Sequence, residues 1–126
     1  MKPATLLTLG GLNAALAIVA GAFAAHGLED TLPPNLLDAF KTGAQYHMYH
    51  ALGLGLVGVV SQRTPASRAL SLAGWLMLTG VILFSGSLYA LALSGITVLG
   101  AITPLGGVVF ISAWLAFAWH GWRSRD

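Results

Sequence analysis

Long apolar stretches separated by short polar segments dominate the pattern of this chain. Four stretches are nearly free of charge, at residues 4–25, 42–60, 69–93 and 104–119. Crossing the hydrocarbon core of a bilayer takes about 20 mostly apolar helical residues. The pattern therefore predicts an all-α integral membrane protein, with four transmembrane helices forming one four-helix bundle over residues 1–126.

Cap residues mark where these helices should begin and end. The second helix is expected to start after a capping Asn35, with Asp38 three residues later in the capping-box position. Gly95 is expected to end the third helix in the left-handed conformation. The third and fourth helices each follow a pair that is typical of an N-cap and a first helical residue, Thr64-Pro65 and Thr103-Pro104.

Composition supports membrane embedding. The chain is 56% hydrophobic and only 8% charged, with a mean hydropathy of +0.78. A soluble domain carries about a quarter of its residues as charged side chains, and so few charges cannot cover a soluble surface of this size. The absence of cysteine excludes disulfides, thiolate metal sites and thiol nucleophiles. The basic residues form no nucleic-acid-binding patch, so no nucleic-acid partner is expected.

The basic residues instead indicate orientation. With four spans, only Lys41 falls on the side that also holds Glu29, Asp30 and Asp38. The positive-inside rule then places both termini in the cytoplasm. The other side holds Lys2, Arg63, Arg68, Arg123 and Arg125.

The first apolar stretch has a second interpretation. Lys2, an apolar run and Ala22-Phe23-Ala24 together resemble a cleavable signal peptide. The stretch is long for a signal sequence, and the remaining chain would still be a membrane protein. A membrane-spanning first helix is therefore the main prediction.

Small residues recur four positions apart in the predicted spans. Gly10 and Ala14 form one such pair, Ala51 and Gly55 another, and Gly21 stands between Ala17 and Ala25. Such pairs let helix backbones approach closely in lipid. They are expected to pack the bundle internally, and a groove for a partner subunit is the alternative.

Polar side chains at membrane depth are functional candidates because burying them in lipid is costly. The predicted topology places most of them in the outer half of the bundle, with Asn13 deeper. This candidate polar cluster consists of Asn13, His26, Gln45, Tyr46, His47 and His50.

Three interpretations of the histidines remain open. Because His47 and His50 lie three residues apart, they share a helix face. They could bond other helices structurally, or handle a proton or ligand. They could also hold a metal with His26, or bind haem with His26 facing His50, although a good metal site needs a third ligand. Structural bonding is the main prediction, with no metal, cofactor or catalytic residue.

Two motifs carry a family resemblance. Residues 22–28 (AFAAHGL) and 40–51 (FKTGAQYHMYHA) resemble the signatures of the YgdD-like family of small four-helix bacterial inner-membrane proteins of unknown function. The resemblance implies a four-span fold and a multi-pass location in the bacterial inner (plasma) membrane. It supplies no activity, substrate or catalytic residue.

The sequence favours a structural or accessory membrane protein without catalytic activity. It would lie in the lipid bilayer, as a homo-oligomer or as part of a larger membrane complex. The alternative function is a binder or transporter of a small ligand, proton or ion, with the polar cluster lining an outer-leaflet pocket.

Overall fold

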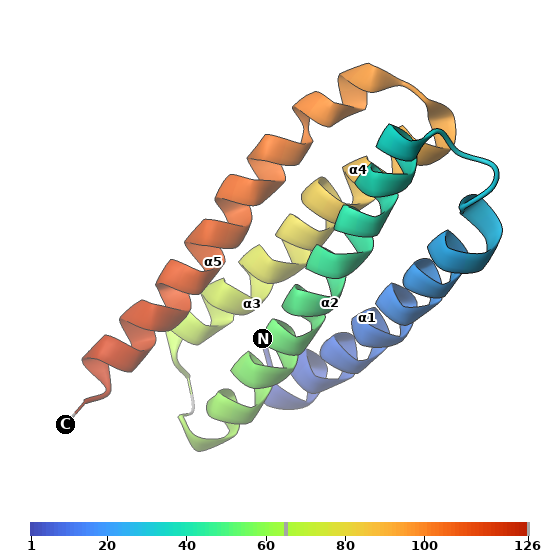
Figure 1. Ribbon diagram of the computed structural model, residues 1–126. Coiled ribbons are helices and arrows are strands. Elements are labelled where there is room, and N and C mark those ends of the chain that lie inside the picture. Colours follow the sequence, from blue (N-terminus) through green and yellow to red (C-terminus); the bar gives the residue numbers. More distant parts are fainter. Residues whose placement is uncertain (65, 126) are drawn as a thin grey trace.

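The computed structural model describes residues 1–64 and 66–125, which are helical throughout apart from short connections (Figure 1). The described residues contain no strand. Four long helical segments result, because α1 runs directly into η1, and α3, η2 and α4 are continuous. The elements are α1 (Pro3–Phe23), the π-helical turn η1 (Ala24–Leu28), α2 (Pro34–Arg63), α3 (Arg68–Gly80), the π-helical turn η2 (Val81–Ser85), α4 (Gly86–Ser94), the 3-10 helix η3 (Thr97–Ala101) and α5 (Thr103–Arg123).

Two of the expected helix starts are wrong. Helix α2 begins at Pro34 after Pro33, so Asn35 lies inside its first turn and does not cap it. Proline suits this position because its fixed φ angle is helical and the first turn needs no backbone N–H donor. Helix α3 begins at Arg68, where the Ser67 hydroxyl accepts a bond from the Leu70 N–H at 3.3 Å.

Of the remaining boundary predictions, the one at Thr64 is wrong, the one at Gly95 is confirmed and the one at Thr103-Pro104 is off by one position. Thr64 follows the end of α2 and does not start α3, while Pro65 lies outside the described residues. Gly95 adopts φ 73°, which confirms the left-handed cap at the end of α4. Helix α5 includes Thr103 as its first residue and Pro104 as its second, one position from the expectation.

Three of the four segments are long and apolar enough to cross a membrane by length and composition: Pro3–Leu28, Arg68–Ser94 and Thr97–Arg123. Helix α2, which contains the predicted span 42–60, does not meet the same measure of apolarity. Its polar run from Gln45 to His50 lowers its hydropathy. This most polar of the long helices also has the largest set of buried residues.

Helix α2 lies at the centre of the packing (Figure 1). Helix α1 packs along one side of it, while α3, η2 and α4 pack along another. Helix α5 packs on α3 and η2. The surface along the long helices carries many large apolar side chains that are exposed, such as Val19 (65% exposed), Ile82 (71%) and Ile111 (62%). Exposed apolar area on this scale is typical of a lipid-facing surface.

Small residues bring α1 and α2 into close contact. A Cβ atom on Gly10 would lie 2.9 Å from the Gly55 backbone nitrogen and 3.0 Å from the Ala51 carbonyl oxygen. This confirms that Gly10 packs internally, against the backbone of Ala51 and Gly55, although a Cβ atom on Gly55 itself would meet no atom within 4 Å. Gly21, in contrast, has no atom within 4 Å of the same position, so its small size serves no contact within the chain.

Two apolar cores lie at opposite ends of the helices. One core, at the end that holds the N-terminus, is built around Leu6, Leu54 and Met77, and the other around Leu28, Leu37 and Phe40. The buried histidines of α2, His47 and His50, lie between them along the chain. The middle of α2 is therefore the polar layer between two apolar ones.

A pair of neighbouring glycines in α5, Gly106 and Gly107, tests the close approach of the α5 backbone to η2. A Cβ on Gly106 would overlap the backbone of Phe84 in η2, whereas one on Gly107 would lie 4.0 Å from the nearest atom of Phe84. Backbone cannot move aside as a side chain can. Gly106→Ala should therefore lower the free energy of unfolding by about 1–3 kcal/mol, the usual cost of overpacking.

Thermal unfolding in detergent measures this effect. Gly107→Ala is the matched control and should unfold at the same temperature as the parent or slightly above, because alanine is the better helix former. Equal melting temperatures for the two variants would contradict the packing described for Gly106.

Candidate functional site

Contacts along α2 fix the height of its histidines. Near its start, Gly43 lies against Tyr89 in α4, and near its end, Gly58 lies against Leu6 in α1. Since α2 runs antiparallel to both neighbours, His47 and His50 lie near the mid-height of the helices. The sequence placed this pair in the outer half of the bundle, whereas the contacts of α2 place it near the middle of that helix. Helix α2 starts at Pro34, which places about four turns before His47.

His47 joins three of the long helical segments. Its Nε2 lies 2.9 Å from Oδ1 of Asn13 in α1, and its Nδ1 lies 3.0 Å from the Tyr89 hydroxyl in α4. The Asn13 amide nitrogen donates to the Leu9 carbonyl oxygen at 2.8 Å, which fixes the amide oxygen toward His47. Because that oxygen only accepts, Nε2 of His47 must carry hydrogen. In the neutral ring, Nδ1 then accepts from Tyr89.

His50 joins α2 to α5. The indole Nε1–H of Trp114 donates to Nε2 of His50 at 3.0 Å. An indole nitrogen is a donor only, so this imidazole nitrogen must be without hydrogen. The other nitrogen, Nδ1, donates to the Tyr46 carbonyl oxygen at 2.7 Å. Phe110 stacks on the imidazole, with ring centroids 3.4 Å apart and planes inclined by 7°.

Opposite tautomers follow for the two histidines. His47 carries its hydrogen on Nε2 and His50 carries its hydrogen on Nδ1, although the residues are three apart on one helix. Both side chains are buried, with 6% and 4% of their surface exposed. All four ring nitrogens have a partner within the chain. In the described part of the chain, every buried side-chain nitrogen and oxygen has a hydrogen-bond partner.

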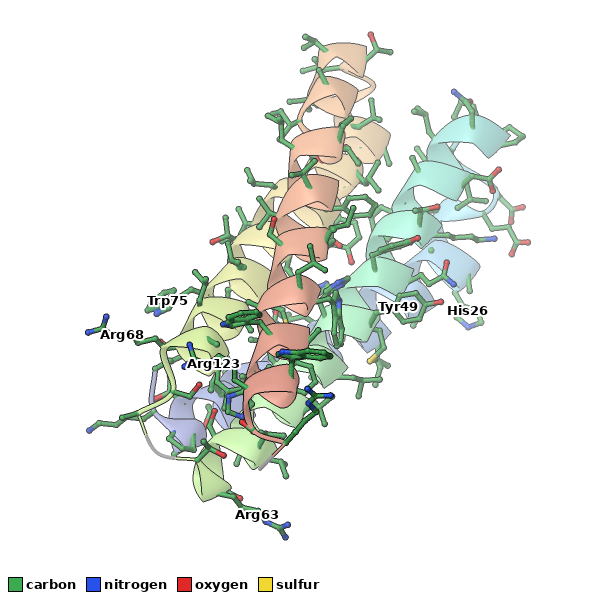
Figure 2. The ribbon with its side chains drawn as sticks, turned by 90° about the vertical axis from the view of Figure 1, so that its left-hand side faces the viewer. His26, Tyr49, Arg63, Arg68, Trp75 and Arg123 are labelled. Atoms are coloured by element: carbon green, nitrogen blue, oxygen red, sulfur yellow. The ribbon has the colours of Figure 1, made fainter. Side chains whose placement is uncertain are left out.

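The structure brings together only part of the predicted polar cluster. Asn13 bonds His47, and Tyr46 adjoins His50, with their rings stacked at 6.3 Å. Gln45 is exposed and bonds Tyr49 at 2.5 Å on the outside of α2. His26 is exposed in η1 and extends from the edge of the molecule (Figure 2).

Sequence reasoning missed the partners from α5 and left the α4 partner out of the candidate cluster. Tyr89, Phe110 and Trp114 complete the cluster, and none was among the candidate site residues. A signal for Trp114 was present, because it lies in the middle of the fourth apolar stretch and not near a membrane interface. A buried indole N–H usually finds a partner, so its position pointed to an internal acceptor. The other tryptophans, Trp75, Trp119 and Trp122, lie nearer one end.

The alternative metal and haem geometries do not form among the described residues. Within residues 1–64 and 66–125, no group of three or more His, Cys, Asp or Glu side chains could hold a metal ion. His26 lies near one end of the molecule and His50 at mid-height, so they do not face one another. The hydrogen bonds run in one direction, from Tyr89 through His47 to Asn13. Neither His47 nor His50 has an unbonded ring nitrogen.

Comparison with known proteins adds the family. The family described as "Protein of unknown function (DUF423)" matches residues 20–107. The chain belongs to the DUF423 family. It is 52% identical over 109 residues to the UPF0382 membrane protein YwdK of Bacillus subtilis, which covers 86% of this chain and 89% of that protein. A UPF0382 membrane protein of Staphylococcus epidermidis is 49% identical over 109 residues, covering 86% and 88%.

These matches confirm the expected class. This DUF423 protein is a small membrane protein of a family without an assigned function. The YgdD-like name is not confirmed, because the matches carry other designations. No solved structure matches the chain.

The opposite tautomers provide a direct test of the site. NMR of the ¹⁵N-histidine-labelled DUF423 protein in lipid should show hydrogen on Nε2 of His47 and on Nδ1 of His50 near neutral pH. Single substitutions to Gln assign the two signals. Hydrogen on the same nitrogen in both rings, or on both nitrogens of either ring, would refute the bonding pattern.

Proposed function

We propose that this protein is a non-catalytic accessory subunit of a membrane assembly, and that its buried polar cluster holds its own helices in register. The complete internal bonding of His47 and His50 carries this proposal. An imidazole whose two nitrogens bond neighbouring groups at 2.7–3.0 Å is already satisfied. Removing such a partner leaves a buried polar group unsatisfied, at a cost of about 1–3 kcal/mol. The cluster is thus suited to fixing helix positions.

The outer face of α2 supports an interaction role. Exposed residues follow one another there at alternating intervals of four and three, which is the spacing of a helix-packing seam. At its start, the Gln45–Tyr49 pair lies at mid-height, and the Tyr49 side chain is 48% exposed. The seam consists of Gln45, Tyr49, Leu52, Leu56 and Val59.

A polar amide facing lipid at this height is costly, and a partner helix removes the cost by bonding it. The Gln45–Tyr49 bond uses one amide N–H and leaves the amide oxygen for a neighbour. The proposal therefore assigns the seam to a helix of another membrane protein. A binder or transporter of a small ligand, proton or ion receives less support, because the His47 and His50 nitrogens are occupied.

Photo-crosslinking from the seam tests the accessory role. A photoreactive amino acid at Leu52, 62% exposed in the seam, should cross-link a specific membrane protein in cells. Ile82, 71% exposed in η2, is the matched control, and the same probe there should give no protein product. Gln45→Leu should weaken the Leu52 product. Products with lipid alone at both positions would remove the accessory role, and a product with a second copy alone would replace it by homo-oligomerisation.

We further propose that all four long segments cross the bacterial inner (plasma) membrane as one four-helix bundle, with both termini in the cytoplasm. Helix α2 is more polar than its neighbours, but it is packed among them and needs less apolar surface. Its 30 residues extend about 45 Å, which exceeds the hydrocarbon core. Five of the six basic residues fall at the end that holds the termini, as the positive-inside rule requires.

Cysteine labelling tests this topology, because the chain has no cysteine of its own. A membrane-impermeant maleimide should label Thr31→Cys, in the connection before α2, on intact spheroplasts. Arg125→Cys should react only after the membrane is permeabilised. Labelling of both positions from outside would rule out four crossings with paired cytoplasmic termini.

A further inference from the structure

A polar pocket of about 340 Å³ lies where the start of α3 meets the end of α5. Its lining includes two arginines, Arg68 and Arg123, together with Ser67, Trp119 and His120. His120 Nδ1 and the Ser67 hydroxyl lie 3.0 Å apart and join the two helix ends. The Arg123 guanidinium lies 5.8 Å from the centre of the Trp119 ring.

Within residues 1–64 and 66–125, no acidic residue lies near this pocket. Glu29, Asp30 and Asp38 all belong to the opposite end of the molecule, around the start of α2. Asp126 lies outside the described residues. Arg68 and Arg123 extend on the same side of the molecule, while Arg63 points away at the end of α2 (Figure 2).

An apolar groove continues from this pocket along the side of the protein. It has a volume of about 540 Å³ between α3 and α5, and it shares Arg68 and Trp119 with the polar pocket. Further along, the groove is lined chiefly by apolar side chains, Leu72, Leu76, Leu115 and Ala116. Of these, Leu72 is 52% exposed and Leu115 is 64% exposed.

We propose that this composite site binds one anionic phospholipid, with its phosphate between Arg68 and Arg123 and an acyl chain in the groove. Guanidinium groups form strong charge-assisted bonds with phosphate oxygens. The groove offers apolar surface directly beside these cations, in the order in which a phospholipid presents its headgroup and chains. The site depends on no protein partner, so this proposal is independent of the accessory role.

Lipid retention by the purified full-length protein tests this site. After reconstitution in nanodiscs of mixed phosphatidylcholine and phosphatidylglycerol, native mass spectrometry should show one retained phosphatidylglycerol, preferred over phosphatidylcholine. The Arg68→Gln/Arg123→Gln variant should lose about tenfold in this preference, equivalent to about 1.4 kcal/mol. Arg63→Gln removes a charge from the same end outside the pocket and should retain the preference. Equal losses for Arg63→Gln and the double variant would overturn the site in favour of diffuse attraction.

A groove variant separates a bound lipid from a bound phosphate ion. Ser112 lines the groove and bonds the Val108 carbonyl of its own helix at 2.9 Å. Ser112→Phe should fill the groove, reduce phosphatidylglycerol retention and leave the melting temperature close to that of the parent. Inorganic phosphate should not compete with the lipid. Competition by inorganic phosphate, or full lipid retention by a folded Ser112→Phe variant, would overturn the phospholipid assignment.

Discussion

A buried imidazole in a membrane protein must find a partner for each of its nitrogens, because lipid offers none. In this protein that constraint acts on two residues of the central helix at once. His47 takes its partners from α1 and α4, and His50 takes one partner from α5 and the other from the preceding turn of α2. The central position of α2 therefore gives both of its buried histidines hydrogen-bond partners for all their ring nitrogens.

The apolar packing is consistent with this central layer. Between helices in lipid, close contact of small residues contributes much of the stability, and Gly10 and Gly106 allow backbone approaches on two sides of the molecule. Apolar cores then occupy the two ends of the helices. The hydrogen bonds fix which residues face one another, while the glycines let the helices come close enough to form those bonds.

Much of the fold could be predicted because hydropathy reports exposure to lipid directly. The helices near 4–25, 69–93 and 104–119 and the Gly95 cap follow from local patterns. The height of the histidines could not be predicted in this way, because it depends on how α2 is aligned along α1 and α4, which the hydropathy of separate spans does not specify. The role of Trp114 depends on which face α5 turns toward α2, which four separate apolar runs do not specify.

The π-helical turn η2 has a consequence for comparing this chain with its relatives. Such a turn holds one residue more than an α-helical turn of the same height. It therefore rotates the residues that follow it about the helix axis relative to α3. Ser85, the last residue of η2, bonds the Gly43 carbonyl at 2.7 Å, while Met77, two turns earlier in α3, lies beside Gly53. Deleting a single residue between Val81 and Ser85 would shorten the helix by little but turn Tyr89 away from His47. A relative with an alignment gap in this segment would therefore have different hydrogen-bond partners in its polar layer.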